Sequence, residues 1–103
     1  MELRNARVLI TGGAGGIGSE IARALLGQGA AVLLADLDAA ALDRVVAGPL
    51  AAHADRVGTV AGNLAEPDGR ARVIEAAAAF RGGINVLVNN AGVNHFALFD
   101  ELS

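Results

Sequence analysis

Residues 6–18 have the sequence Ala-Arg-Val-Leu-Ile-Thr-Gly-Gly-Ala-Gly-Gly-Ile-Gly. This order predicts an apolar strand, a glycine-rich turn and the start of a helix. Gly12 allows the sharp turn off the strand, Gly16 removes a side chain where backbone would approach a phosphate, and Gly18 lets the helix lie close to the sheet. The first helical turn then directs free N–H groups and the positive end of the helix dipole at an anion. The stretch is therefore a candidate pyrophosphate site.

Asp36 ends the next apolar run, which covers residues 30–35. It follows the glycine turn at about the ~20-residue separation at which an acid on the second strand reaches an adenosine ribose. A carboxylate there accepts both ribose hydroxyls and repels a 2′-phosphate. The alternatives for Asp36 are a surface acid or a helix N-cap, but Asp38 fits the N-cap better because an apolar helical pattern begins at Leu42.

Strands and helices alternate along the chain, with no repeat, linker or low-complexity segment. The expected strands cover residues 6–11, 30–36, 56–61 and 84–88. The expected helices cover residues 16–28, residues 39–47, and a segment from Pro67 to the Gly82-Gly83 pair. The apolar face of the first helix is formed by Ile17, Ile21 and Leu25, and that of the third by Val73, Ala77 and Phe80. This alternation with right-handed crossovers predicts an α/β fold with a parallel sheet.

Length and composition predict a single domain over residues 1–103. The content of 53% apolar and 3% aromatic residues is typical of helices packed on a parallel sheet that is covered on both faces. No apolar run approaches ~18 residues, so we expect no membrane span. The chain has no cysteine, which favours a reducing cytoplasm, and its net charge of −3 argues against nucleic acid. No histidine or carboxylate cluster has metal-ligand spacing, so no metal is expected.

A second motif, Asn89-Asn90-Ala91-Gly92, follows the fourth expected strand. Together with Thr11-Gly12-x-x-x-Gly16-Ile17-Gly18 and Asp36, it resembles the short-chain dehydrogenases/reductases, which are NAD(P)-dependent oxidoreductases built on one Rossmann domain. The resemblance covers essentially the whole chain. It implies the strand order three, two, one, four, with the ligand bound at the carboxyl ends of the strands.

The resemblance also implies residue roles. Ile17 would lend a backbone N–H to the pyrophosphate, and Leu37 would wall one side of the adenine. Asn63 stands where the family usually has an aspartate, and its amide oxygen can still accept a hydrogen bond from the adenine amino group. Asn89 is expected to tie neighbouring strands instead. The implied cofactor-binding positions are Gly12, Gly16, Ile17, Gly18, Asp36, Leu37, Asn63, Leu64, Asn90, Ala91 and Gly92.

The cofactor expected from these residues is NAD(H) rather than NADP(H). Besides Asp36, the two positions where NADP-preferring relatives usually place a basic residue are occupied here by Gly15 and Leu37. Nothing at these positions would pair with a 2′-phosphate.

The family's hydride transfer uses a serine, a tyrosine and a lysine that lie beyond the Asn-Asn-Ala-Gly element. This chain has no tyrosine and all eight of its basic residues are arginine, so no catalytic residue is assigned. The last residue, Ser103, resembles the N-cap of a further helix. We therefore expect the cofactor-binding front of a longer enzyme, truncated after the fourth strand, that moves hydride between nicotinamide and a carbonyl or secondary alcohol. The alternative is a stand-alone, non-catalytic nucleotide-binding or interaction module.

The fourth strand is expected to leave one edge open. Residues 84–88 are apolar and contain no charge or proline that would discourage pairing. We expect the chain to self-associate through this strand or to pair there with a missing C-terminal half.

Overall fold

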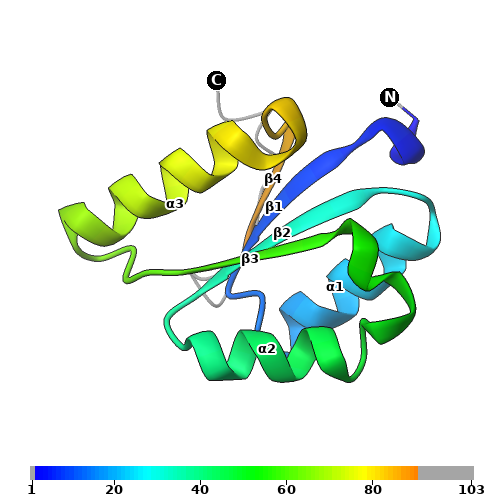
Figure 1. Cartoon of the computed structure of the whole chain (residues 1–103), viewed down its shortest axis with the longest axis horizontal. Helices are drawn as coiled ribbons and strands as arrows, with labels where there is room; N and C mark the ends of the chain where they lie inside the picture. Colours follow the sequence, from blue (N-terminus) through cyan, green and yellow to red (C-terminus); the bar gives the residue numbers. More distant parts are fainter. Residues whose placement is uncertain (1, 91–103) are drawn as a thin grey trace.

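Four parallel strands form the centre of the computed structural model, which describes residues 2–90 (Figure 1). They are β1 (Arg7–Thr11), β2 (Ala31–Asp36), β3 (Val57–Ala61) and β4 (Val86–Asn89). Their order in the sheet is β3-β2-β1-β4, and every neighbouring pair is parallel. The predicted fold class and strand order are confirmed.

The connections between the strands are helical. The α-helices are α1 (Gly16–Gly27), α2 (Ala39–Ala47) and α3 (Pro67–Ala79). Three short 3-10 segments precede strands: η1 (Leu3–Asn5), η2 (Ala51–Arg56) and η3 (Phe80–Gly82). None of the helices within residues 2–90 is long and apolar enough to cross a membrane.

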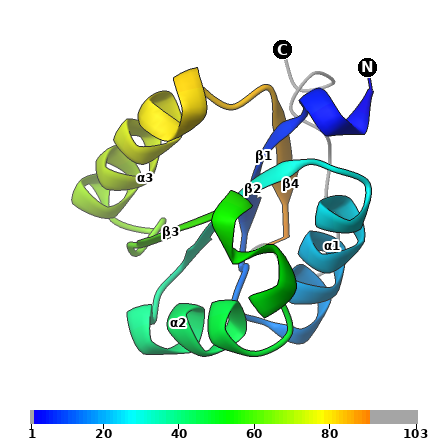
Figure 2. The same ribbon diagram turned by 45° about the vertical axis from the view of Figure 1, so that its right-hand side comes forward.

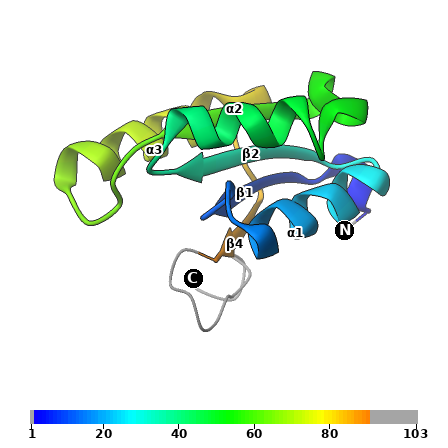
Figure 3. The ribbon, with the colours of Figure 1, turned by 90° about the horizontal axis from the view of Figure 1, so that it is seen from below.

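Helices α1 and α2 cover one face of the sheet, and α3 covers the other (Figure 2). On one face α1 packs over β1 and β2, while α2 packs over β2 and β3 (Figure 3). The other face is covered by α3, whose Val73 and Ala77 pack against Leu9 and Leu33. Because side chains alternate along a strand, the next residues along β1 and β2 face the α1 and α2 side. The sheet is thus buried on both faces, as its composition predicts.

The predicted apolar face of α1 is confirmed in part: Ile21 and Leu25 pack against the core cluster, but the fully buried face is shifted by one residue. Ile17 is 64% exposed, and Ile21 and Leu25 are only partly buried. The residues that α1 buries lie one position further along: Gly18, Ala22 and Leu26. Two of these residues, Gly18 and Ala22, are small, so they let the helix approach the sheet closely and carry little hydrophobic signal in the sequence.

The ends of the other elements lie close to the predicted ones. Val73 and Ala77 are buried and Phe80 packs against the same cluster, as expected for α3. The fourth strand, however, begins at Val86 rather than Ile84. Ile84 instead donates its N–H to the carbonyl of Ala77 in α3 at 3.2 Å, so it belongs to the turn that leaves the helix.

Candidate functional site

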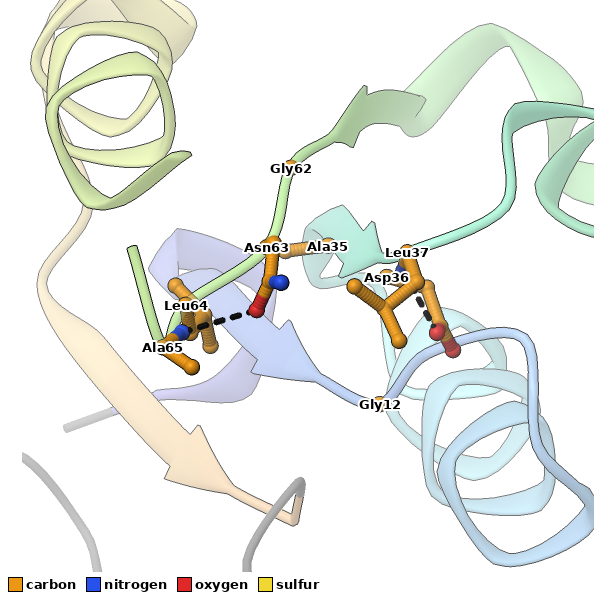
Figure 4. A pocket seen from close by; sticks show the side chains of 8 residues that line it. All are labelled: Gly12, Ala35, Asp36, Leu37, Gly62, Asn63, Leu64 and Ala65. Carbon is orange, nitrogen blue, oxygen red and sulfur yellow. Dashed lines mark hydrogen bonds between the residues drawn. The ribbon is translucent and has the colours of Figure 1, made fainter. Parts of the chain in front are cut away.

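One cleft lies where β1, β2 and β3 end (Figure 4). It has a volume of about 310 Å³. The carboxyl ends of parallel strands are where ligands bind in sheets of this kind. The eight lining residues are Gly12, Ala35, Asp36, Leu37, Gly62, Asn63, Leu64 and Ala65. Five of the predicted cofactor positions therefore share this cleft: Gly12, Asp36, Leu37, Asn63 and Leu64.

The three glycines of the predicted motif meet different surroundings. Gly12 has φ +68°, which allows the turn off β1 without strain on a side chain. Apart from the adjoining residues and the backbone of α1 itself, no heavy atom lies within 4 Å of the point where Gly16 would carry a Cβ, so that side of the loop is open. A Cβ on Gly18 would collide with the carbonyl oxygen of Gly12 and come within 3.0 Å of Asn90 Nδ2. Gly18 is therefore required for packing, whereas Gly16 leaves space.

The start of α1 presents unpaired donors. Its N-cap residue is Gly15, which has no side chain to bond the first turn. The N–H groups of Gly16, Ile17 and Gly18 have no acceptor among residues 2–90, and the first turn contains no acid. Free N–H groups and the positive end of the helix dipole together suit an anion such as a phosphate.

Asp36 connects the end of β2 to the glycine loop. Its Oδ2 accepts the N–H of Ala14 at 2.9 Å and its Oδ1 accepts the N–H of Leu37 at 2.7 Å. The carboxylate is therefore held at the edge of the cleft beside Gly12 (Figure 4). Each oxygen keeps a second lone pair, so the group can still accept two hydroxyl donors.

Leu37 and Asn63 lie at the rim of the cleft. Leu37 is 67% exposed, which leaves a free apolar surface for a planar ring. Asn63 Oδ1 accepts the N–H of Ala65 at 2.9 Å and thereby closes the turn after β3. The amide oxygen expected to receive the adenine amino group thus already has one partner, and its second lone pair is the one left for a ligand.

Gly69 supports the Asn63 turn from α3, a contact that the sequence analysis missed. A Cβ at Gly69 would collide with the backbone of Asn63. The glycine within the first turn of a helix is the only local signal for this contact, because glycine is a poor helix former and its presence there asks for a packing reason.

The Asn89-Asn90 pair joins β4 to β1. The Thr11 hydroxyl donates to Asn89 Oδ1 at 3.1 Å and accepts the N–H of Asn90 at 2.9 Å. The expected strand-tying role of Asn89 is confirmed. Asn90 Nδ2 also donates to the carbonyl of Gly12 at 3.3 Å, so its side chain holds the glycine loop. The other two predicted positions of this motif, Ala91 and Gly92, lie outside the described residues.

A family model described as short chain dehydrogenase matches residues 6–103, so the chain belongs to the short-chain dehydrogenase family. It is 43% identical over 95 residues to a 4-formylbenzenesulfonate dehydrogenase of Comamonas testosteroni, covering 92% of this chain and 37% of that protein. It is 37% identical over 92 residues to a 2,3-dihydroxy-2,3-dihydro-p-cumate dehydrogenase of Pseudomonas putida, covering 89% and 36%. The chain thus spans about a third of the length of these curated relatives.

Solved structures of similar proteins share the fold. The L-sorbose reductase of Gluconobacter frateurii, solved with NADPH and L-sorbose, superposes with a TM-score of 0.77 at 30% identity. That match covers 87% of this chain and 35% of the reductase. A 3-ketoacyl-(acyl-carrier-protein) reductase from Brucella melitensis, solved with NADH, gives a TM-score of 0.74 at 29% identity over 84% of this chain and 34% of that one.

Proposed function

We propose that this chain binds a nicotinamide dinucleotide, with NAD(H) preferred, and forms the cofactor-binding part of an oxidoreductase. The free N–H groups at the start of α1 would hold the pyrophosphate, and Asp36 would accept the hydroxyls of the adenosine ribose. Leu37 would lie against the adenine. The bound nicotinamide would supply hydride transfer, and this chain's own residues would bind and orient it.

The preference for NAD(H) rests on one observation, the Asp36 carboxylate in the wall of the cleft. None of the eight residues that line the cleft is basic, and Asp36 is the acid among them. A 2′-phosphate on the ribose would bring negative charge next to this carboxylate with no guanidinium to balance it. The two relatives of known structure do not decide the point, because one was solved with NADPH and the other with NADH.

Fluorescence titration with NADH and NADPH tests this preference. NADH is expected to bind at least about tenfold more tightly, which corresponds to about 1.4 kcal/mol. Asp36→Arg should shift the preference toward NADPH, and Asp36→Asn, which removes the charge and keeps an acceptor for the Ala14 N–H, should reduce discrimination. Asp38→Asn is the matched control, because it removes an acid two residues away and preserves an N-cap. Tighter binding of NADPH by the unmodified chain would contradict the proposal.

The reaction we propose for the whole protein is hydride transfer between the nicotinamide and a carbonyl or secondary alcohol. The named relatives are dehydrogenases and reductases, which gives no support to a non-catalytic module. The printed chain contains no tyrosine and no lysine, so we propose that the proton-transfer residues lie outside it.

We also propose that the free side of β4 pairs with another strand. Within residues 2–90, β4 pairs with β1 alone. Its Val86 and Leu87 are partly buried, and the strand carries no charged residue. An uncovered apolar edge offers a template for pairing with a second chain. Light scattering at tens of micromolar should show self-association of the 103-residue chain, whereas a monodisperse monomer with slow hydrogen exchange along β4 would refute it.

A further inference from the structure

Four arginines gather at the edge of the sheet opposite the cleft. Arg4 lies in η1, Arg7 begins β1, Arg56 ends η2 before β3, and Arg81 lies in η3 before β4. All four line one hollow of about 400 Å³. These residues are half of the eight cationic side chains in a chain whose net charge is −3. The amino ends of the strands therefore carry a concentration of positive charge that the chain as a whole lacks.

Arg7 and Arg81 are held in place by backbone carbonyls. Arg7 Nε donates to the carbonyl of Gly83, and Arg81 Nη2 donates to the carbonyl of Asp55 at 2.6 Å. The Arg81 guanidinium also lies over the Phe80 ring, 5.8 Å from its centroid. These contacts fix the guanidinium groups but leave both terminal nitrogens of Arg7, and the Nε and Nη1 of Arg81, without a hydrogen-bond partner among residues 2–90.

Arg56 contributes positive charge to the hollow, but both of its terminal nitrogens already have hydrogen-bond partners. Its Nη1 donates to the carbonyl of Ala30, and its Nη2 donates to the carbonyl of Leu26 at 3.0 Å and lies 3.0 Å from His53 Nδ1. It therefore caps the end of α1, where carbonyl groups carry partial negative charge. The donors left for a ligand in the hollow belong chiefly to Arg7 and Arg81.

Within residues 2–90 a carboxylate pairs with one of these four arginines. Within residues 2–90, Arg4 forms an ion pair with Glu2 at 2.8 Å, and Arg7, Arg56 and Arg81 form none. Arg81 moreover adopts φ +50°, and it is the one residue other than glycine with positive φ in the described part of the chain. A left-handed backbone costs free energy for a residue with a Cβ, so it calls for a compensating interaction at this position.

We propose that this hollow binds a phosphate group. Guanidinium groups present paired N–H donors that match the oxygens of a phosphate, and the bonds are charge-assisted. Two prepositioned arginines with free terminal N–H groups, together with the charge of Arg56, form such a receptor, and Arg4 stands beside them in its pair with Glu2. The hollow is large enough for a phosphate together with part of the molecule that carries it. The proposal does not depend on cofactor binding, because the cleft lies at the other edge of the sheet.

Isothermal titration of the chain with inorganic phosphate, at an ionic strength matched with chloride, tests the site. Arg81→Gln should weaken phosphate binding about tenfold, because it removes one charge and its fork of donors. Arg72→Gln is the matched control, since Arg72 also donates to one backbone carbonyl, that of Ala61 at 3.0 Å, but lies on α3 away from the hollow. Binding by this control should equal that of the unmodified chain.

Two further measurements keep the proposal open to refutation if Arg81→Gln fails to fold. Glu2→Gln, which frees Arg4, should tighten phosphate binding about twofold to threefold. Glycerol phosphate should bind more tightly than inorganic phosphate if the natural ligand is a phosphorylated metabolite, and equally if it is free phosphate. The proposal is overturned if phosphate adds no heat beyond chloride, if Arg72→Gln weakens binding as much as Arg81→Gln, or if Glu2→Gln has no effect.

Discussion

Two of the helices that start at the carboxyl edge of the sheet, α1 and α2, treat their first N–H groups in opposite ways. At α2, Asp38 Oδ1 accepts the N–H groups of Ala40 at 2.9 Å and Ala41 at 3.3 Å. At α1, the N-cap is Gly15 and nothing within residues 2–90 accepts the three N–H groups that follow. Helix ends are normally capped because unpaired donors cost free energy. The start of α3 also lacks a side-chain cap, but its first turn contains Pro67, which has no N–H, and the acid Asp68. The start of α1 has free donors and no acid, so it suits an anion, and the capped α2 provides its internal reference.

Asp36 lies between the uncapped start of α1 and the capped start of α2, and it caps neither helix. Its carboxylate bonds the N–H groups of Ala14 and Leu37, which precede the first turns of α1 and α2. The acid thus fixes the loop in front of α1 without consuming the donors of the helix itself. A ligand would meet a rigid loop, a carboxylate and free N–H groups within one site.

The largest expected effect is the absence of catalysis in a chain whose free α1 end is proposed to bind the cofactor. The 103-residue chain should show no measurable reduction of carbonyls with NADH, because it has no tyrosine or lysine to transfer the proton. Loss of a positioned acid alone costs about 10²–10⁴-fold in rate. The assay follows NADH consumption by chain of verified mass, with a complete short-chain dehydrogenase as positive control. Turnover above the level of a mock purification would disprove the prediction.

A cap introduced at α1 should abolish the difference between the two helices. Gly15 already has the extended backbone of an N-cap, so Gly15→Asp can bond the free N–H groups as Asp38 does in α2. We expect NADH affinity to fall about 100-fold, because the carboxylate occupies the donors and repels the pyrophosphate. The free energy of unfolding should rise by about 0.5–1 kcal/mol.

Gly27→Asp is the control for this change. It adds the same charge to α1 at its other end, where an added Cβ meets open space; at Gly15 an added Cβ would make an ordinary contact with the Gly12 carbonyl oxygen at 3.5 Å. NADH affinity should then stay unchanged in a fluorescence titration. Equal losses of affinity in the two variants would show that net charge, and not the free helix end, determines binding.

The glycines around the same turn should respond differently to one added methyl group. Gly18→Ala should destabilise the chain by about 1–3 kcal/mol, because its Cβ collides with the Gly12 carbonyl. Gly16→Ala meets open space, so stability should be unchanged or higher by about 0.4–1 kcal/mol. Denaturation by urea measures both variants. If Gly16→Ala destabilises the chain as much as Gly18→Ala, the division into a packing glycine and an open one is wrong.

Local patterns were sufficient to predict the order of the elements, the strand order implied by the family resemblance, and the Asp38 cap. The elements and the cap depend on neighbours in sequence: a β-branched run, a glycine turn, or an N-cap before an apolar helix. The free N–H groups of α1 were predicted on the same basis. The strand order instead rests on the family resemblance. The cofactor-binding roles of the cleft residues remain predictions, although the structure brings five of them together.

The features that the sequence analysis missed depend on contacts between distant segments. Gly13 is an example, because a Cβ there would come within 2.8 Å of Leu34 Cβ in the neighbouring strand. Asn85 is another: its Oδ1 accepts the N–H of Arg7 at 2.7 Å, which sets the start of β4. The most deeply buried face of α1 was misplaced by one residue because two of its three residues, Gly18 and Ala22, are small and give little hydrophobic signal. No local pattern of the chain specifies such close approaches, since they depend on which segments fold together.

The smallest expected effect concerns the reference helix. Asp38→Ala should lower the free energy of unfolding by about 1 kcal/mol, because the N–H groups of Ala40 and Ala41 lose their acceptor. The helix also loses a negative charge next to the positive end of its dipole. Asp43→Ala removes an exposed acid from the body of the same helix and should change stability by less than about 0.5 kcal/mol. NADH affinity should be the same for both variants, since neither touches α1. If Asp38→Ala weakens NADH binding as well, the two helix ends act together, and α2 is no longer an independent reference for the open end of α1.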